Sequence, residues 1–208
     1  MPSPLTFHDQ SGCAKAAAIV KSGGVIAFRT DTFYGLGVDP LKGAAVQRIR
    51  ALKGRETAKP ILILIASLAD LDRFIINRSE LFDRVAERFW PGPLTIVGAA
   101  AGELPEELTA GSGRIGARLP DVARVRELVR DCGGALTATS ANLSGAAEAR
   151  TAAEVAGYFR SGIDLILDGG PVEATKASTV VDLSGDELRV IREGAICTQD
   201  IVKSISKV

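Results

Sequence analysis

Short runs of aliphatic residues alternate along the chain with segments whose apolar residues recur every three or four positions. Such runs are typical of buried strands, and the wider spacing is typical of helices with one apolar face. In the segment 44–53, for example, Val46, Ile49 and Leu52 share one face while arginines lie elsewhere. This pattern predicts helices over 14–21, 44–53, 80–89, 122–130 and 151–160, and strands over 25–28, 60–66, 94–97, 115–119, 135–139, 164–167, 178–183 and 188–192.

Capping and turn signals support this order of elements. Ser67 with Asp70, and Thr151 with Glu154, have the spacing of a capping box, which predicts a helix start at each place. The turn Ser184-Gly185-Asp186 predicts that the last two strands form a hairpin. Helical connections together with a late hairpin predict an α/β fold, in which helices pack on a twisted mixed sheet.

Composition narrows the class of protein. The chain has 208 residues, of which 46% are hydrophobic, and this predicts a single domain with a self-sufficient core. The 25 basic and 25 acidic residues give a net charge of zero, which argues against a general nucleic-acid coat. A local basic patch of Arg48, Arg50, Lys53 and Arg55 stays open.

Cysteine and histidine usage excludes several chemistries. The three cysteines are odd in number and widely spaced, which fits a reducing compartment better than a disulfide framework or a zinc site. His8 is the single histidine, so a Ser-His-Asp triad or a histidine-rich metal centre is not expected. No apolar run approaches about 18 residues, and we expect a cytoplasmic protein without a membrane span.

Two candidate sites lie in the first third of the chain. Thr30-Asp31-Thr32 comes one residue after the apolar run 25–28, and ligands of open α/β sheets bind beyond the carboxyl ends of strands. The alternative is a structural turn in which the same side chains cap backbone N–H groups. Lys53-Gly54-Arg55, with Lys59 nearby, has the composition of a phosphate clamp. The alternative is a pair of cations that interact with the dipole at a helix C-terminus.

Two further candidates lie in the second half. Ser140-Ala141-Asn142 and Ser144 offer hydroxyl and backbone N–H groups for phosphate oxygens, or form an ordinary polar loop. Ser178-Thr179 precedes a final strand that carries Arg192, although hydroxyl residues are common in strands. The glycine-rich signatures of P-loop and dinucleotide folds are absent. The residues alone therefore indicate an α/β protein with an anion site and leave the substrate open.

The same four places, in this order, resemble the YrdC/TsaC family of threonylcarbamoyl-AMP synthases. The resemblance spans about residues 14–196; an N-terminal segment 1–13 and a helical tail 197–208 lie outside it, and we expect no additional C-terminal domain. It rests on six short motifs: Thr30-Asp31-Thr32-Phe33-Tyr34-Gly35-Leu36-Gly37 with Lys53-x-Arg55, Trp90-Pro91-Gly92-Pro93-Leu94-Thr95, Arg118-Leu119-Pro120, Ser140-Ala141-Asn142-Leu143-Ser144-Gly145, Ser178-Thr179-Val180-Val181-Asp182 and Arg192-Glu193-Gly194.

The resemblance implies a single-domain, YrdC-like open twisted mixed sheet with a concave ligand surface. It implies an ATP-dependent nucleotidyltransferase that converts L-threonine, bicarbonate and ATP into threonylcarbamoyl-AMP and pyrophosphate, the first step of threonylcarbamoyladenosine (t6A) formation in tRNA. Mg2+ is expected to bridge phosphate oxygens, without a metal tightly bound by the protein. A downstream threonylcarbamoyl-transfer machinery is the implied partner, together with tRNA or double-stranded RNA.

The resemblance also implies roles for single residues. Arg118 is expected to pair with the threonine carboxylate, and Thr32 and Ser178 to recognise the amino acid. The residues expected to bind ATP are Lys53, Arg55, Lys59, Ser140, Asn142 and Arg192, of which Lys53 and Arg55 are expected to be catalytic.

The chain departs from the family pattern at three positions. Arg29 and Glu56 stand where the family commonly has proline, and Leu64 stands where some members have histidine, although shorter members have leucine there. Two alternatives stay open: a YciO-like paralogue with another role, and an RNA-binding protein of the same fold without synthase activity.

Overall fold

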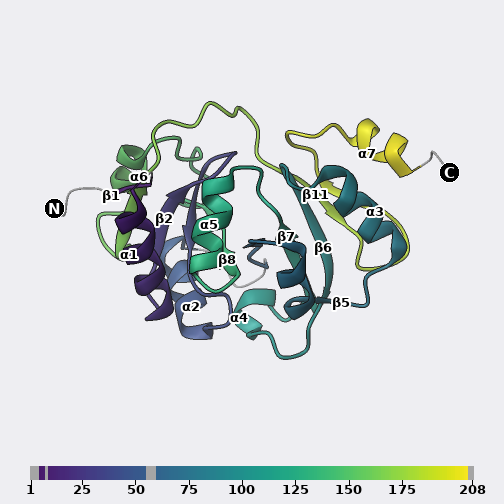
Figure 1. The fold of residues 1–208 in the computed structure, drawn as a ribbon, viewed down its shortest axis with the longest axis horizontal. Helices are drawn as coiled ribbons and strands as arrows, with labels where there is room; N and C mark the ends of the chain where they lie inside the picture. The colour runs from purple at the N-terminus through teal and green to yellow at the C-terminus, as the bar shows by residue number, and fades with distance from the viewer. Residues whose placement is uncertain (1–4, 8, 55–59, 206–208) are drawn as a thin grey trace.

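A computed structural model describes residues 5–7, 9–54 and 60–205 of the chain (Figure 1). The helices are α1 (Gln10–Lys21), α2 (Gly43–Leu52), α3 (Glu80–Phe89), α4 (Glu106–Thr109), α5 (Ala123–Asp131), α6 (Ala152–Tyr158) and α7 (Thr198–Ile205), with a 3-10 helix η1 (Leu68–Arg73). The strands are β1 (Leu5–Thr6), β2 (Ile26–Arg29), β3 (Tyr34–Gly37), β4 (Ile63–Ile65), β5 (Ile75–Ile76), β6 (Leu94–Ala100), β7 (Arg114–Arg118), β8 (Ala135–Thr137), β9 (Thr139–Ser140), β10 (Leu165–Asp168), β11 (Thr179–Asp182) and β12 (Arg189–Arg192).

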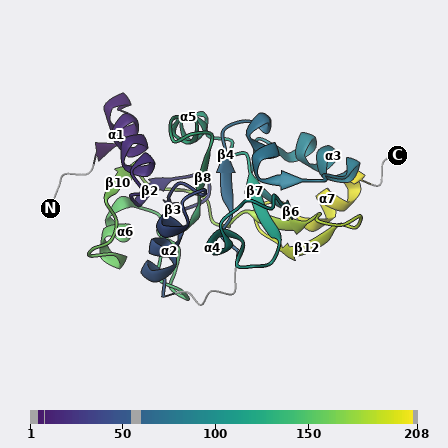
Figure 2. The ribbon, with the colours of Figure 1, turned by 90° about the horizontal axis from the view of Figure 1, so that it is seen from below.

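These strands form two mixed sheets that lie side by side (Figures 1 and 2). The five-stranded sheet has the order β1-β10-β2-β3-β9, with α1 on one face and α2 and α6 on the other. The seven-stranded sheet has the order β12-β11-β6-β7-β4-β8, and β5 pairs with β6 outside this path. The structure confirms the mixed α/β fold class and divides its strands between two hydrogen-bonded sheets.

The chain crosses from one sheet to the other at Ala138. β8 is antiparallel to β4 in the seven-stranded sheet, and β9 is antiparallel to β3 in the five-stranded sheet. The backbone N–H of Thr137 donates to Val38 O at 3.1 Å, and the N–H of Val38 donates to Thr137 Oγ1 at 2.9 Å. The strand predicted over 135–139 is therefore two strands, because its ends pair with different sheets.

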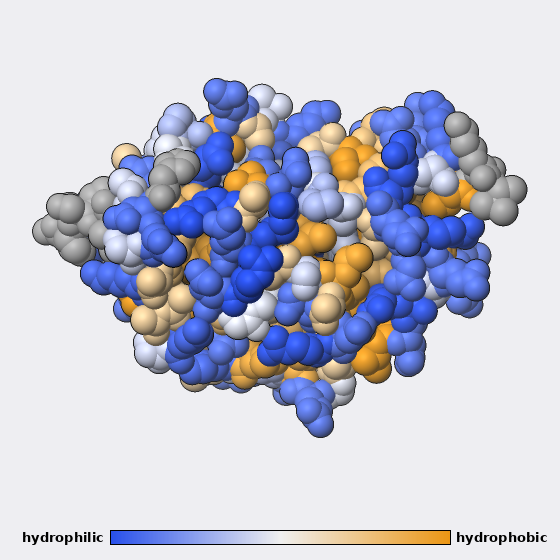
Figure 3. Space-filling view, viewed as in Figure 1, coloured by the Kyte–Doolittle hydropathy of each residue, from blue (hydrophilic) through white to orange (hydrophobic). Residues whose placement is uncertain are grey.

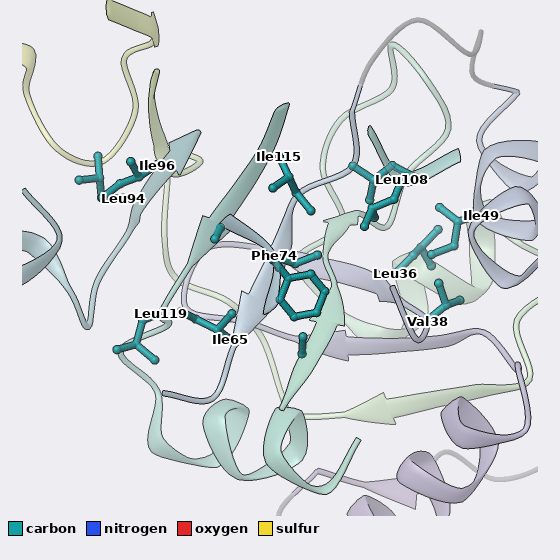
Figure 4. Close-up of a cluster of buried hydrophobic side chains, with 14 of the residues drawn as sticks. Leu36, Val38, Ile49, Ile65, Phe74, Leu94, Ile96, Leu108, Ile115 and Leu119 are labelled. Carbon is teal, nitrogen blue, oxygen red and sulfur yellow. The ribbon is translucent and has the colours of Figure 1, made fainter. Parts of the chain in front are cut away.

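The larger apolar core is shared by the two sheets. Figure 4 shows Phe74 between side chains of the seven-stranded sheet, such as Ile115, and side chains of the other half, such as Leu36 and Ile49. A second cluster packs α1 and α5 against β2 and includes Phe28. On the face shown in Figure 3, hydrophilic residues predominate and hydrophobic ones form separate patches. None of the helices in the described ranges combines the length and the apolarity that a membrane crossing requires.

Most element predictions are confirmed, and their errors have local causes. α3 has the predicted bounds and is capped by Ser79, whose Oγ accepts from the N–H of Phe82 at 3.2 Å. α1 begins four residues earlier than predicted, at Gln10, because Asp9 caps it. Ser67 begins only a 3-10 helix, since its hydroxyl donates to Asp70 Oδ2 rather than accepting from a backbone N–H. The predicted hairpin is confirmed as β11 and β12, which are antiparallel.

Strands β1, β3 and β5 were not predicted: β1 and β5 have two residues each, and the sequence of β3, Tyr-Gly-Leu-Gly, is poor in strand formers. Close packing explains the second glycine: a Cβ on Gly37 would lie 2.8 Å from the Phe28 ring and 2.9 Å from Leu136. β3 is antiparallel to β2, so residues 30–33 form the turn of a hairpin and not a strand-to-helix connection.

Candidate functional site

A cavity of about 770 Å3 covers one face of the seven-stranded sheet. Alternate residues of a strand point to the same face of a sheet, so Arg114, Gly116 and Arg118 of β7 all line the cavity. Side chains of β6, β11 and β12 extend this wall, and residues of β3, β9 and the turn before β3 close one side. The cavity is therefore built by both sheets. Its polar lining residues are Thr30, Thr32, Thr95, Ser112, Arg114, Arg118, Thr139, Ser140, Glu148, Ser178, Asp182 and Arg192.

Arg118 is the central cation of the site. Its side chain is only 4% exposed, and its Nε donates to Gly92 O at 3.1 Å. One terminal nitrogen donates to Thr32 Oγ1 at 3.2 Å, and the other forms an ion pair with Asp31. A guanidinium has five N–H donors, so these contacts leave one N–H on each terminal nitrogen. Two parallel donors suit a carboxylate or a phosphate.

The turn between β2 and β3 holds Arg118 from one side. Thr30 Oγ1 donates to Phe33 O at 2.6 Å and accepts from the backbone N–H groups of Thr32 and Phe33, at 3.1 and 3.2 Å. Asp31 uses one carboxylate oxygen for Arg118, whereas its Oδ1 is buried without a hydrogen-bond partner among the described residues. Such an atom costs about 1–3 kcal/mol, which marks the turn as a place where a ligand is expected.

A pair of buried hydroxyls, on Thr95 and Ser178, also lines the cavity. Thr95 Oγ1 of β6 and Ser178 Oγ, just before β11, are 3.0 Å apart. Arg192 of β12 donates to Ser178 O at 2.8 Å and to its Oγ at 3.4 Å. Whichever hydroxyl donates to the other, the pair keeps one O–H for a ligand.

Positive charge prevails around Arg118. Burial lowers the pKa of the Arg118 guanidinium, and the nearby Arg192 lowers it further, whereas Asp31 raises it. Two guanidinium groups and one carboxylate leave a net positive charge; Arg118 and Asp31 are largely buried, whereas Arg192 is exposed. An anionic ligand relieves this desolvated charge, so the geometry favours a carboxylate or phosphate guest.

Lys53, at the C-cap of α2, organises the loop that follows β9. Its side chain is buried, and Nζ contacts four oxygen atoms of this loop. These are the carbonyl of Ser140, Ser140 Oγ at 3.2 Å, the carbonyl of Asn142 at 3.0 Å and Asn142 Oδ1 at 3.1 Å. Ser144 returns a hydrogen bond to Lys53 O at 3.0 Å. Lys53 thus holds the loop in place, and Ser140, where the loop begins, lines the cavity.

An ion pair lies toward the other end of β7. Arg114 donates to Asp182 Oδ2 at 2.9 Å. Burial raises the pKa of Asp182, but hydrogen bonds from Ser184 and the charge of Arg114 outweigh it and lower the pKa below its usual value. Asp182 is therefore ionised at neutral pH.

The structure brings together five of the predicted site residues: Thr32, Arg118, Ser140, Ser178 and Arg192 all line the cavity. Lys53 and Asn142 lie behind Ser140 and contact one another. Arg55 and Lys59 lie outside the described residues, as does Glu56. In the part of the chain described, no group of three or more acidic, cysteine or histidine side chains could hold a metal ion.

The basic patch left open by the sequence does not form an exposed surface in its described part. Arg50 and Lys53 are buried, and Arg50 donates to Glu107 O at 2.7 Å. Arg48 pairs with Asp164 at 2.9 Å. Arg29, which replaces a proline of the family pattern, packs against Gly169 and is not part of the cavity wall.

Sequence reasoning assigned no role to Thr95, and it placed Asp31 in a candidate site without predicting its partner. Thr95 contacts a residue 83 positions away, and Asp31 pairs with an arginine 87 positions away, so local patterns do not reveal these partners. Both residues nevertheless lie inside motifs that carried the family resemblance. Membership in these motifs was the sequence signal that could have marked them as site residues.

A mixed α/β fold with three arginines and several hydroxyls in one cavity is typical of proteins that bind small anionic ligands. The chain belongs to the Sua5/YciO/YrdC family, described as telomere recombination, whose pattern matches residues 18–194. The family resemblance of the sequence is thereby confirmed.

Three known proteins illustrate the relationship. A Pyrococcus abyssi protein named threonylcarbamoyl-AMP synthase is 35% identical over 193 residues, which is 93% of this chain and 57% of the relative. The crystal structure of P. abyssi Sua5 complexed with L-threonine matches with a TM-score of 0.91 and 34% identity, over 96% of this chain and 59% of the other. The crystal structure of E. coli YciO matches with a TM-score of 0.84 and 26% identity, over 93% and 94%. The chain spans a little more than half the length of the first curated relatives it matches, 57% and 55%.

Proposed function

We propose that this protein is a threonylcarbamoyl-AMP synthase, which joins L-threonine, bicarbonate and ATP and releases pyrophosphate. One observation carries the proposal: Arg118, Thr32, Ser178 and Arg192 converge in a single cavity from four different segments. The guanidinium of Arg118 can bind a carboxylate, and several hydroxyl groups lie in the same cavity. This combination suits a small hydroxy amino acid. The name of the Pyrococcus abyssi relative, and the L-threonine in the related P. abyssi structure, support the same substrate.

In the proposed reaction, the amine of threonine attacks the carbon of bicarbonate or carbon dioxide and forms a carbamate. With bicarbonate, one water leaves. A carbamate oxygen then attacks the α-phosphorus of ATP, the bond from that phosphorus to the bridging oxygen breaks, and pyrophosphate departs. Such a displacement depends on positioning and charge stabilisation more than on a nucleophilic side chain. A site of arginines and hydroxyls meets that demand.

The ATP side of the proposal rests on the loop after β9. Ser140 lines the cavity and its Oγ accepts from Lys53 Nζ, so that its hydroxyl proton is available to a phosphate oxygen. We assign Arg192 to the nucleotide from the opposite wall. Asn142, Arg55 and Lys59 complete the proposed ATP set, with Lys53 and Arg55 as the catalytic pair. Mg2+ would enter with ATP, bound to its phosphate oxygens.

Pyrophosphate release tests the proposal. Full-length protein is incubated with ATP, Mg2+ and bicarbonate together with threonine, serine, valine or 2-aminobutyrate. We expect strong release with threonine, less with serine and little with the other two, because a site that bonds a hydroxyl rejects analogues without it. Release that is equal with threonine and 2-aminobutyrate would contradict hydroxyl recognition, and release with none of them would refute the synthase.

The wider setting is part of the same proposal. Residues 14–196 form the YrdC-like domain, and the product passes in the cytoplasm to a threonylcarbamoyl-transfer machinery that modifies tRNA to t6A. The second candidate is a YciO-like role, which the YciO structure favours because this chain covers 94% of it. Absence of threonine-dependent pyrophosphate release would select this alternative.

A further inference from the structure

The edge strand of the seven-stranded sheet, β12, has an irregular register (Figure 2). It is antiparallel to β11, and Val181 of β11 pairs with Val190. The preceding residue, Val180, pairs with Arg192. Ile191 is therefore an extra residue of β12, and Ile191 and Arg192 together oppose the single residue Val180. This arrangement is a β-bulge.

The bulge brings two neighbouring side chains to one face of the sheet. In a regular strand, successive side chains point to opposite faces. Here Ile191 and Arg192 both line the cavity. Ile191 is 60% exposed, more than any other large hydrophobic residue in the described part of the chain. An apolar side chain so exposed at a cavity is a candidate ligand contact.

Ile191 continues an apolar floor of the cavity. Val180 of β11 and Val97 of β6 line the same cavity, together with Gly116 and Leu62. A Cβ on Gly116 would lie 3.5 Å from Leu62 Cβ and 3.6 Å from a methyl group of Val97, so a side chain there would fill the space between these two residues. Because Gly116 has none, this space is open to a ligand, and a flat apolar group fits above it.

Exposure separates the two ends of the ligand. Arg118 and Ser178 are each 4% exposed, so a bound threonine lies in the buried part of the cavity. Ile191 lies at the open side, next to Arg192, which the proposed function assigns to the nucleotide. The cavity of about 770 Å3 is within the range of about 300–1,000 Å3 typical of sites for ligands larger than an amino acid. Among the parts of the proposed substrates, the nucleobase has the largest apolar face.

We infer that the bulge in β12 makes Ile191 a ligand-binding residue, whose side chain packs against the nucleobase of the bound nucleotide. The inference rests on the proposed function for the presence of a nucleotide. The face of a base is similar in all nucleotides, so this contact contributes affinity without distinguishing ATP from GTP. Arg192 and Ile191 thus act on different parts of one ligand, the first on charge and the second on the base.

Tripolyphosphate isolates the contribution of the base, because it has the three phosphates of ATP without the adenosine. We titrate both compounds calorimetrically, with Mg2+, into the full chain and into Ile191→Ala. Val190→Ala is the matched control, since Val190 lies on the same strand, is 37% exposed and is not among the residues that line the cavity. The ratio of the dissociation constants, tripolyphosphate over ATP, is compared between proteins, so the charge difference between the two compounds cancels.

The ratio should fall about threefold to tenfold in Ile191→Ala, because less apolar area is buried against the base, and should stay at the wild-type value in Val190→Ala. Tripolyphosphate affinity should be the same in all three proteins. Ile191→Thr keeps the β-branch that strands favour, and its ratio should fall as well if the alanine variant does not fold.

An unchanged ratio in these variants would overturn the inference. Equal weakening of both compounds would overturn it too, since Ile191 would then act through the phosphate contacts of Arg192. Failure of the wild type to bind ATP would instead refute the proposed function.

Discussion

At the scale of single residues, the site shows how a buried charge can be held ready for a ligand. Arg118 satisfies three of its N–H donors within the protein, through Gly92, Thr32 and Asp31. Removing one partner of a buried ion pair costs several kcal/mol, so this arginine serves the fold as well as the site. The two remaining N–H groups are the part available to a substrate.

Replacement of Arg118 by lysine separates charge from geometry. Lysine keeps the positive charge but loses the planar fork, and we expect the threonine concentration at half-maximal rate to rise at least tenfold while ATP binding changes little. Steady-state kinetics with threonine varied at saturating ATP measures the threonine concentration at half-maximal rate. Calorimetric titration with ATP measures ATP binding.

Arg114 provides the matched control, because it lies on the same strand and pairs with Asp182 at a half-exposed position. Arg114→Lys should keep the wild-type threonine dependence. An Arg118→Lys protein with wild-type threonine dependence would show that Arg118 forms only a structural ion pair.

At the scale of elements, the connection between α2 and the loop after β9 depends on Lys53. Four loop oxygens surround its ammonium, and two of them are backbone carbonyls. Lys53→Met keeps the length of the side chain and removes the donor, so these oxygens lose their partner. We expect a loss of about 2–4 kcal/mol in the free energy of unfolding, measured by urea denaturation.

Lys21→Met is the control for that experiment, since Lys21 is an exposed lysine in the last turn of α1. Its effect should stay within about 0.5 kcal/mol. If both variants were equally stable, the contacts of Lys53 would have no net effect on stability, and the loop would be held by other residues.

The packing of α1 on α5 should make stability fall at alkaline pH. Burial raises the pKa of Cys132, the residue that caps α5, to about 12, from a reference value of 9.0. Above pH 9 the unfolded chain releases this proton and the folded chain keeps it, so the contribution to stability is full below pH 9 and is lost as pH rises toward 12. Between pH 8 and pH 10 the wild type should lose about 1 kcal/mol more than Cys132→Ala. Urea denaturation of both proteins at the two pH values gives this difference, and equal losses would contradict the assignment.

Local sequence patterns predicted an element well where residues of that element alone determine its structure. α3 has an apolar face and a serine cap, and its bounds are as predicted. β3 and the break at Ala138 were not predicted, because close approach of distant side chains and pairing with a second sheet decide them. The same limit applies to the site: motifs located Thr32, Arg118 and Ser178, whereas the Thr95 partner of Ser178 required the register of β6 and β11.

At the scale of the whole molecule, the two sheets act as one unit. The larger core cluster contains residues of both sheets, and the cavity takes its walls from both. A net charge of zero over 208 residues gives no general attraction for polyanions, so selectivity for anions depends on local groups such as the arginines of this cavity. Binding in the cavity should therefore be coupled to the stability of the entire fold.

Thermal unfolding tests this coupling. A ligand at one hundred times its dissociation constant adds about 2.7 kcal/mol to the folded state, and for a chain of 208 residues this corresponds to a rise of about 5–10 °C in Tm. We expect threonine to produce this shift in a single cooperative transition, valine to produce little at the same concentration, and Arg118→Lys to lose most of it. Calorimetry that resolved two transitions, of which only one moved with threonine, would show that the sheets unfold separately and that the cavity belongs to one of them.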